Sequence, residues 1–473
     1  MDKYEEFKKE AKKAVELFKQ LDKNETIRVI CHIDADGISA CAILIKTLNL
    51  DNRKYSISTI QQVNNDVLVS LSKEPYKYII FADIGAGSLE AIKEKLPDKR
   101  IFILDHHEYD CKEIPENVTL LNPHMFDIDG GKEISGSGVV YFFCKNLNEG
   151  IENLAHIAIV GALGDIQEKG GFFRLNDEIL RTAVNKGNID AQKGLRLFGS
   201  QTRPIHKVLE YSTDPYIPGV SGSESGSIQF LHQIGIEPKN GKNWKKIVHL
   251  DEEEMKKLVG GIIMKRFGES KPDDVLGNVY LLPKEKEESP LKDAREFATL
   301  LNACGRMGKA SLGIGACLGD RKTQERAVRS LTDYKREIVN GMNWYRDNQD
   351  SNDFIKGNGF IIINAKDQVL PTIIGTIASI ISKSNDLKEG TFVLSMAQLV
   401  DGTTKVSLRI AGYRNQGVDL SKIVQSMTSR IEGAVAGGHM QAAGALLPSD
   451  KEAAFIEIAK EILEREALEE RVD

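Results

Sequence analysis

The stretch IFILDHHEYD, residues 101–110, joins four apolar residues directly to an aspartate and two histidines. A short continuous apolar run is typical of a strand that is buried on both faces of a sheet. We therefore predict that a buried strand ends at Leu104. The side chains of Asp105, His106 and His107 would then emerge at the carboxyl end of that strand.

The same kind of apolar run recurs through the first 185 residues, where it alternates with helical stretches. The runs are TIRVICHIDADG, SISTIQQV, YKYIIFADIGAG and KRIFILDHH, and they are separated by stretches such as ISACAILIKTLNL and SLEAIKEKL. Apolar strands that alternate with helices predict an α/β fold with a parallel sheet covered on both faces. In such sheets, ligands bind beyond the carboxyl ends of the strands.

Acids and imidazoles follow three of these strands. One acid in this place is usually a turn or cap residue, and for Asp83 alone we would favour a helix cap. Three strand ends that bring such residues to one edge are harder to explain as caps, because each cap serves only its own helix. We expect Asp34 and Asp36, on alternate residues of an extended segment, to project to one side. With Asp165, at the end of an apolar helix, the candidates are His32, Asp34, Asp36, Asp83, Asp105, His106, His107 and Asp165.

The five carboxylates in this set need a counter-charge. Two carboxylates about 4 Å apart repel each other by about 4 kcal/mol at an effective dielectric constant of about 20. Two divalent cations would supply that charge. A mixture of carboxylate and imidazole without thiolate favours Mn²⁺ or Mg²⁺, with Co²⁺ or Zn²⁺ as alternatives.

The composition indicates a soluble globular protein. The 473 residues are 41% hydrophobic and 28% charged, which is enough for two or three domains. No stretch approaches the roughly 18 consecutive apolar residues of a membrane span, and the charged beginning is unlike a signal peptide, so we expect a cytoplasmic protein. The six cysteines form no C-x-x-C pair and are expected to be packing residues. Because the net charge is −6, a nucleic-acid substrate would have to be held by a local cluster of Arg and Lys.

The pattern changes after the first 200 residues. A run rich in Pro, Gly and Ser, followed by helical patterns and the strand NVYLL, predicts an inserted subdomain at about 201–290. We then expect a helix with Ser289 as its N-cap and Pro290 at its first position. Asn302 and Arg306 would share one face of this helix. A long charged helix should follow at about 321–350.

The last 120 residues alternate again. GFIIINA, TFVLSMAQ and TKVSLRI predict strands, and the ranges 369–384, 418–432 and 450–468 predict helices. Ser407 and Arg409 would share a strand face. A turn formed by Gly437, Gly438 and His439 is expected to precede a helix of small residues and to offer free backbone N–H groups to an anion. A close-packed glycine contact is the alternative for this turn.

At this point the sequence resembles a known family. HIDADG at 32–37, Asp83 in FADIG, the DHH triplet at 105–107 and Asp165 in GALGD look like the ordered motifs of the DHH phosphoesterases. NACGRMG at 302–308 resembles the RecJ nuclease motif, and VSLRI at 406–410 with GGHMQAAG at 437–444 resembles the DHH-associated domain. The resemblance extends to archaeal RecJ-like exonucleases of the GINS-associated type. His32 departs from bacterial RecJ and matches the wider superfamily.

The resemblance implies roles for the candidate residues. One metal would be held by His32, Asp34 and Asp83, and the other by Asp36, Asp83, His106 and Asp165, so that Asp83 bridges the pair. Asp105 would orient a neighbouring imidazole, and His107 would donate to a phosphate oxygen or to the leaving group. The expected substrate-binding residues are Asn302, Arg306, Ser407, Arg409, Gly437, Gly438 and His439.

The resemblance also implies a layout and an activity. We expect a DHH phosphoesterase domain at 1–200, the insertion at 201–290, the RecJ-type motif and connecting helix at 291–352, and a smaller α/β DHH-associated domain at 353–473, with the active site in the cleft between domains. The expected activity is metal-dependent exonucleolytic hydrolysis of single-stranded DNA, 5′ to 3′, in replication or repair. RNA is an alternative substrate.

Two other functions stay open. A small-substrate phosphatase of the same superfamily would share the metal motifs but would not need NACGRMG or the insertion. A structural replication factor would predict eroded ligands. The insertion is a candidate contact for GINS, with shielding of the cleft as the alternative.

Overall fold

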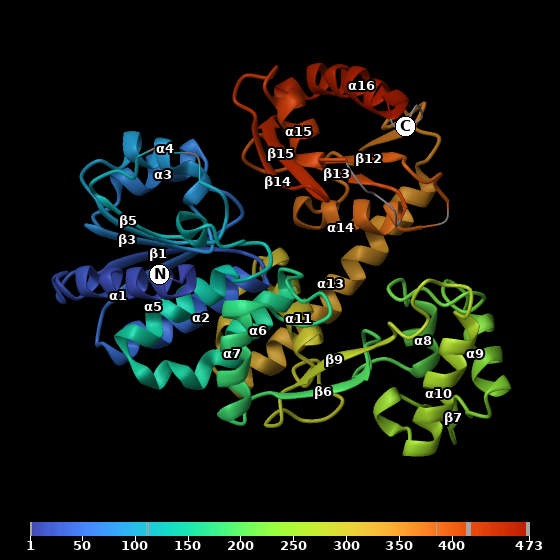
Figure 1. Ribbon diagram of the computed structural model, residues 1–473. Helices are drawn as coiled ribbons and strands as arrows, with labels where there is room; N and C mark the ends of the chain where they lie inside the picture. Colours follow the sequence, from blue (N-terminus) through green and yellow to red (C-terminus); the bar gives the residue numbers. More distant parts are fainter. Residues whose placement is uncertain (1, 110, 112, 385, 413–417, 470–473) are drawn as a thin grey trace. The chain divides into compact units, whose positions relative to one another are not determined.

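The protein is described here by a computed structural model that covers residues 2–109, 111, 113–384, 386–412 and 418–469. The chain forms two compact units, Met1–Leu331 and Thr332–Asp473. The first contains a parallel sheet and the second a mixed sheet (Figure 1).

The first unit is built on a five-stranded parallel sheet with the strand order β2-β1-β3-β4-β5. Four of the strands lie in the predicted runs, which confirms the α/β fold. The short fifth strand, VTLL, was not predicted. The strands are β1 (Ile27–His32), β2 (Tyr55–Ile60), β3 (Tyr78–Ala82), β4 (Arg100–Leu104) and β5 (Val118–Leu121).

Helices cover both faces of this sheet (Figure 1). On one face, Phe81 and Ile103 pack with Leu71 and Ile92, which come from the two covering helices. On the other face, Phe102 packs edge-on against rings from two further helices. The inner strands β1, β3 and β4 are buried on both faces, which explains why they are continuous apolar runs. The helices are α3 (Asn65–Lys73) and α4 (Leu89–Lys95) on the first face, and α1 (Lys3–Lys19), α2 (Ala35–Leu50) and α5 (Gly136–Leu147) on the second.

The insertion leaves and rejoins the first unit through an antiparallel strand pair. β6 (Asp190–Leu195) pairs with β9 (Leu276–Leu281). Leu195, just before the insertion, therefore lies beside Leu276, just after it. The segment between them has its own apolar core, which includes Phe230, Leu258 and Ile262. Its elements are α8 (Ile205–Glu210), α9 (Glu224–Gln233), β7 (Lys239–Asn240), β8 (Asn243–Trp244) and α10 (Glu252–Lys265).

The remaining elements of the first unit are helical. α6 (Ala155–Gly164) ends at Asp165 as predicted, and the long charged helix is α13 (Arg321–Asp347), which runs across the division between the units. The other helices are α7 (Arg174–Asn185), α11 (Ala294–Arg306) and α12 (Ala310–Cys317), with 3₁₀ turns at Ala86–Ser88, Pro123–Phe126, Glu149–Leu154 and Ile247–His249.

The predicted start of α11 is wrong. The helix begins at Ala294, and its N-cap is Asp293, whose side chain accepts hydrogen bonds from the N–H groups of Arg295 and Glu296. Ser289 and Pro290 lie in the preceding turn. The backbone there is committed to pairing with the end of β9, because Leu282 N donates to Lys292 O at 2.8 Å. The helix therefore begins only after Lys292 in the chain.

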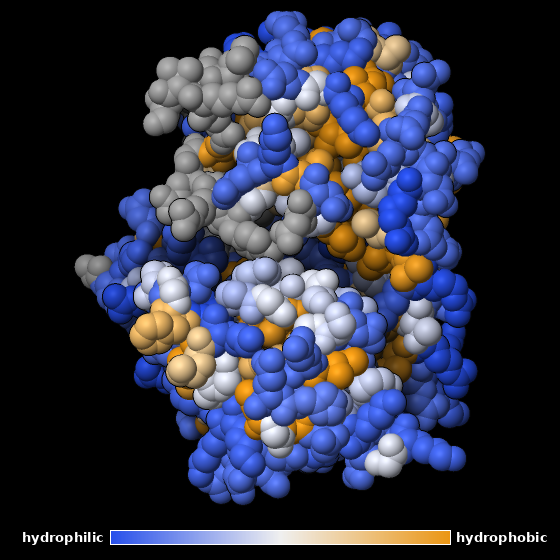
Figure 2. Space-filling model, turned by 90° about the vertical axis from the view of Figure 1, so that its right-hand side faces the viewer, coloured by the Kyte–Doolittle hydropathy of each residue, from blue (hydrophilic) through white to orange (hydrophobic). Residues whose placement is uncertain are grey.

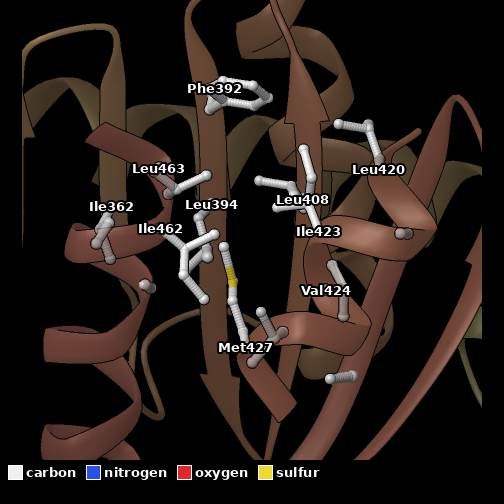
Figure 3. Close-up of a cluster of buried hydrophobic side chains, with 14 of the residues drawn as sticks. Ile362, Phe392, Leu394, Leu408, Leu420, Ile423, Val424, Met427, Ile462 and Leu463 are labelled. Atoms are coloured by element: carbon white, nitrogen blue, oxygen red, sulfur yellow. The ribbon is translucent and has the colours of Figure 1, made fainter. Parts of the chain in front are cut away.

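The second unit contains a six-stranded mixed sheet with the order β10-β11-β12-β13-β15-β14. Leu394, Leu408 and Met427 meet Ile462 in the core between this sheet and two helices (Figure 3). The elements are β10 (Phe354–Gly357), β11 (Phe360–Asn364), α14 (Pro371–Ser382), β12 (Phe392–Gln398), β13 (Thr403–Ile410), α15 (Leu420–Thr428), β14 (Val435–His439), β15 (Ala442–Pro448), a 3₁₀ turn at Ser449–Lys451 and α16 (Glu452–Glu469).

The predicted turn and small-residue helix near Gly437 are wrong. Residues 435–448 form the antiparallel hairpin β14–β15, in which Gly437 pairs with Gly444. The small residues are needed because Gly444 also pairs with Ser407 on the other side, and a Cβ at Gly444 would lie 2.5 Å from Val406 O. The alternative of a close-packed glycine contact therefore describes this segment better than a helix N-terminus.

The surface and the cysteines agree with the composition. The face drawn in Figure 2 is mostly hydrophilic, with scattered apolar residues. None of the described helices is long and apolar enough to cross a membrane. All six cysteines are buried free thiols, which confirms that they are packing residues.

The core of the second unit makes a first prediction. Leu394→Ala should lower the unfolding free energy of that unit by about 2–5 kcal/mol, because a fully buried leucine leaves a cavity when it is truncated. Hydrogen exchange should show faster exchange of the amides in β11–β13, while the amides of β1, β3 and β4 serve as an internal reference. The exposed Val400→Ala is the control. Equal exchange in both variants would contradict the assignment of this core.

Candidate metal centre

Three adjacent strands of the parallel sheet deliver the candidate ligands to one edge. His32 is the last residue of β1, Asp83 follows β3 directly, and His106 comes two residues after β4. Asp165 reaches the same place from the end of α6. Potential ligand atoms of His32, Asp34 and Asp83 lie within 4.8 Å of one another, as do those of Asp36, His106 and Asp165. The structure therefore gathers all six predicted ligands into two neighbouring groups.

The expectation of an extended segment at Asp34 and Asp36 is wrong. Asp34 is the N-cap of α2, and its Oδ1 accepts a hydrogen bond of 2.9 Å from Gly37 N. Asp36 lies in the first helical turn and is 1% exposed. The tight turn into α2 is what separates the two carboxylates. Asp34 joins His32, and Asp36 joins His106.

The N-terminus of α5 holds the Asp36 carboxylate. Gly136 N donates to Asp36 Oδ2 at 2.7 Å, and Ser137 N donates to Oδ1 at 3.1 Å. The hydroxyl of Ser137 donates to the same Oδ1. Free N–H groups at a helix start favour a carboxylate, so this contact fixes the orientation of Asp36.

Asp83 lies between the two groups without a hydrogen-bond donor. It is 1% exposed, and among the described residues no hydrogen bond reaches either of its carboxylate oxygens. Oδ1 lies 3.3 Å from His106 Nε2, and Oδ2 lies 3.6 Å from His32 Nδ1. A buried carboxylate without a donor is costly unless a cation compensates it. The residues present therefore fit divalent cations, and Asp83 presents one oxygen to each group.

The backbone conformation and the packing around Asp83 tightly constrain the position of its side chain. Its φ of +60° lies in the left-handed region, which is uncommon for a residue other than glycine. A Cβ added to Gly136 would lie 2.0 Å from Asp83 Oδ1. Glycine at 136 is thus required for α5 to approach the carboxylate. Asp83 is not a helix cap, since no backbone N–H donates to it.

The two histidines of the DHH triplet are oriented by different oxygens. His106 Nδ1 lies 2.6 Å from Gly130 O, which favours the tautomer with its proton on Nδ1 and leaves Nε2 to face Asp36 and Asp83. His107 Nδ1 lies 2.7 Å from Asp105 Oδ1. Asp105 Oδ2 accepts from Ala86 N, so Asp105 is held from both sides.

The pKa values of the clustered acids and histidines are shifted because many charged groups lie close together. Burial and the neighbouring carboxylate of Asp83 raise the pKa of Asp36 well above its ordinary value. Burial also raises the pKa of Asp165. For His106, burial lowers the pKa, but the acids around it outweigh burial and raise it well above the ordinary value. The carboxylates and imidazoles thus hold protons between them when no cation is present.

The pKa values of Asp34 and Asp105 are lowered, whereas that of Asp36 is raised. Burial opposes the ionisation of Asp34, yet His32 outweighs it and lowers the pKa of Asp34. Burial likewise opposes the ionisation of Asp105, and His107 lowers its pKa. For His32 and His107, burial lowers the pKa, and the acids beside them raise it overall. Each of these two carboxylates is therefore ionised beside an imidazole.

The predicted substrate-binding residues lie in both units. On α11, Asn302 Oδ1 accepts from Ala35 N at 2.9 Å, so this side chain supports the turn that carries Asp34. Arg306 is the last residue of α11 and is half-buried.

In the second unit, Ser407 and Arg409 lie on β13, and Arg409 Nε donates to Ser379 Oγ at 2.9 Å. Gly437 and Gly438 lie in β14. The side chain of His439 lies outside the described part of the chain.

Three residues that shape the site were missed by sequence reasoning. Gly130, Gly136 and Ser137 lie after β5, in a segment for which the sequence led to no prediction. The start of α5, SGSG at 135–138, was the available signal, because small residues with a capping serine indicate a helix N-terminus that another group can approach closely.

The chain is similar in sequence to known protein domains. Three family models match it: the N-terminal domain of the DHH family at residues 26–163, the DHH-CID domain at 197–278 and the DHHA1 domain at 358–465. An uncharacterised protein of Methanocaldococcus jannaschii is 32% identical over 472 residues, with 98% of each chain covered.

Solved structures share the fold at low sequence identity. Exonuclease RecJ bound to manganese aligns over 96% of this chain and 94% of its own, with a TM-score of 0.56 and 16% identity. RecJ of Thermus thermophilus in complex with Mn²⁺ has a TM-score of 0.57 and 16% identity, and 97% of this chain spans 55% of that longer one. CDC45 of Entamoeba histolytica has a TM-score of 0.62 and 11% identity, with 97% of both chains covered.

The close approach of α5 predicts the effect of a single methyl group. Gly136→Ala should weaken Mn²⁺ binding by at least about 10-fold, because the Cβ would displace Asp83 or withdraw the N–H groups from Asp36. Calorimetric titration with Mn²⁺ would measure the affinity. Gly87→Ala is the matched control, since its Cβ would come no closer than 3.7 Å to another atom, Glu108 O. Unchanged affinity in Gly136→Ala would contradict this geometry.

The raised pKa values of His32 and His106 predict a pH dependence of metal binding. As the pH falls through these raised values, protons compete with the cation, so the Mn²⁺ affinity should fall; as the pH rises above them, the affinity should level off. Binding near pH 7 should release protons. Titration in buffers with different ionisation enthalpies measures that release, and binding without any would rule out the shared protons.

Proposed function

This chain belongs to the DHH family and has the RecJ-like fold, and we propose that it is a metal-dependent exonuclease that hydrolyses single-stranded nucleic acid from one end. One observation carries the proposal: the buried carboxylate of Asp83 receives no hydrogen bond from the residues that the structure describes, and it lies between two groups of ligand atoms. This arrangement fits a pair of divalent cations, and the family supplies the class of phosphodiester chemistry.

The residues of the two groups have distinct parts in this proposal. His32, Asp34 and Asp83 would hold one cation, and Asp36, His106 and Asp165 the other, with Asp83 shared. Two such cations, with Mn²⁺ favoured over Mg²⁺ or Co²⁺, would supply an activated water and charge compensation for the phosphate. Backbone groups hold Asp34, Asp36 and His106 in place before substrate arrives, which lowers the cost of reorganisation.

His107 is the imidazole best placed to reach a substrate. Its side chain is 34% exposed, whereas that of His106 is 3% exposed. Asp105 fixes its Nδ1 and raises its pKa overall, so His107 holds a proton that it can donate to a phosphate oxygen or to the leaving group. Asp105 acts through His107 as a positioning residue.

We assign substrate binding to residues from both units. In the first unit, Arg306 would bind a backbone phosphate with the help of Asn302. In the second unit, Arg409 would do so with the help of Ser407, Gly437, Gly438 and His439. Since the chain carries a net charge of −6, such local cations would have to provide most of the affinity, and binding should weaken with added salt.

The remaining assignments follow the predicted layout. Residues 1–200 would form the catalytic domain and 353–473 the substrate-binding domain, with the motif and helix at 291–352 between them. The insertion at 201–290 would contact a protein such as GINS. We favour single-stranded DNA, attacked 5′ to 3′ during replication or repair in the cytoplasm, over RNA.

Two rival functions have specific support. The shared fold of CDC45 favours a structural replication factor, but the complete set of ligand side chains at the sheet edge favours catalysis. A phosphatase that acts on dinucleotides or other small substrates would use the same metal groups. The second unit and the insertion are easier to explain with a polymeric substrate.

Digestion of end-labelled oligonucleotides tests the proposal. The purified protein should shorten single-stranded DNA stepwise from one end with Mn²⁺, and chelator should stop the reaction. Asp83→Ala should reduce the rate by more than about 100-fold, since even residues behind the ligands of a metal contribute about 10–100-fold. Asp98→Ala, at an exposed position of the same unit, should retain the rate of the unaltered protein.

Three results would decide against the exonuclease. Cleavage limited to di- to tetranucleotides would favour the small-substrate phosphatase. No cleavage of DNA, RNA or dinucleotides would favour the structural factor. Full activity of Asp83→Ala would reject the two-cation account. The label that is lost first, and the comparison of DNA with RNA, would give the polarity and the sugar preference.

A further inference from the structure

The side chain of Gln167 is buried beside two of the candidate ligands. It is 2% exposed and follows Asp165 by two residues. Its Nε2 donates to Asp165 Oδ2 at 2.8 Å and to Gly130 O at 2.8 Å. An amide nitrogen carries two hydrogens, so these contacts use both of them.

Gly130 O connects Gln167 to the second ligand. His106 Nδ1 lies 2.6 Å from the same carbonyl oxygen, and a carbonyl has two lone pairs to offer. Gln167 and the Nδ1–H of His106 can therefore donate to it together. The carbonyl thus keeps Nε2 of His106 as the ligand atom, and Gln167 fixes where that carbonyl lies relative to Asp165.

A second amide anchors the other end of Gln167. Asn176 Nδ2, in the first part of α7, donates to Gln167 Oε1 at 2.7 Å. Asn176 is itself fully buried, and its backbone N donates to Glu133 O at 2.9 Å. Because Oε1 receives this hydrogen bond, Nε2 must face Asp165 and Gly130. The orientation of the Gln167 amide is therefore determined by its partners.

The backbone conformation around Gln167 gives a second indication that its position is constrained. Gln167 N donates to Ala162 O at 3.0 Å, which closes the end of α6 across a left-handed residue. That residue is usually glycine, but here it is Ile166, with a φ of +57°. Ile166 is 73% exposed, so burial of its side chain does not offset the strain. The turn at Ile166 directs Asp165 and Gln167 to the same side.

We propose that Gln167 is a positioning residue that holds His106 and Asp165 together as ligands of one cation, with Asn176 fixing its amide. This inference rests on the proposed function and adds residues that set the geometry of one of its two metal groups. Among the described residues, the hydrogen bonds of the Gln167 side chain reach none of His32, Asp34 and Asp83. The two groups should therefore respond differently when Gln167 is changed.

Titration of the full-length protein with Mn²⁺ tests this. Gln167→Ala should weaken one Mn²⁺-binding step by about 10–100-fold and leave the other within about 2-fold of the unaltered protein. Gln167→Glu should weaken the same step at least as much, because a carboxylate would face Asp165 Oδ2 and Gly130 O without donating to either. Asn176→Ala should act in the same direction but less strongly. The exposed Gln192→Ala is the control and should bind as the unaltered protein does.

The outcomes separate this inference from the proposed function. If Gln167→Ala binds both cations with unaltered affinity, the positioning role is rejected, whatever the protein hydrolyses. If Gln167→Ala does not fold, Asn176→Ala decides, and unaltered affinity there rejects the role as well. If the unaltered protein binds Mn²⁺ with the expected response of the variants yet hydrolyses no nucleic acid, Gln167 keeps its role and the exonuclease proposal fails.

Discussion

The site depends on the burial of one carboxylate, that of Asp83, which receives no hydrogen bond from the described part of the chain. Asp83 is placed at the centre of a parallel sheet edge, where the surrounding acids repel it. A buried carboxylate is costly unless a cation or shared protons compensate its charge. The ligands around it, the glycine that admits α5 and the backbone of Asp83 itself all serve this one position. The fold must therefore be stable enough elsewhere to hold it, and the two-sided core of the parallel sheet supplies that stability.

Much of the site could be predicted because its residues lie at the ends of apolar runs. A run such as IFIL has one structural solution in a two-sided sheet, so Asp105, His106 and His107 had to emerge at its carboxyl end. The supporting atoms could not be predicted in the same way. Gly130 contributes a carbonyl, and Gly136 contributes an N–H and the absence of a side chain. A carbonyl such as that of Gly130 leaves no distinctive residue type in a sequence, whereas Gly136 left a signal in SGSG at 135–138.

Two of the three wrong local predictions have a common cause. Near Pro290 and near Gly437, the residue types favour a helix start, and a helix was predicted there because the strand that pairs with each segment could not be recognised from the sequence. Pairing with the end of β9 delays α11 until Asp293, and pairing with β13 turns the small residues around Gly444 into a strand. Propensity is a weak guide wherever a neighbouring strand offers the backbone its hydrogen bonds. The strands predicted from the long buried runs were correct, because burial and strand pairing favour the same conformation there.

The strand pair formed by β6 and β9 has a consequence for how this chain can vary. Leu195 and Leu276 face each other across the pair, so the two ends of the stretch between them, residues 196–275, are neighbours in space. A short turn could join these ends, as in an ordinary hairpin, without a change in the direction of either strand. The stretch has its own core, and its ends meet, as is typical of segments that are gained, lost or exchanged as a whole between relatives. The edge of the sheet that carries the candidate ligands could then persist through evolution while this module is replaced.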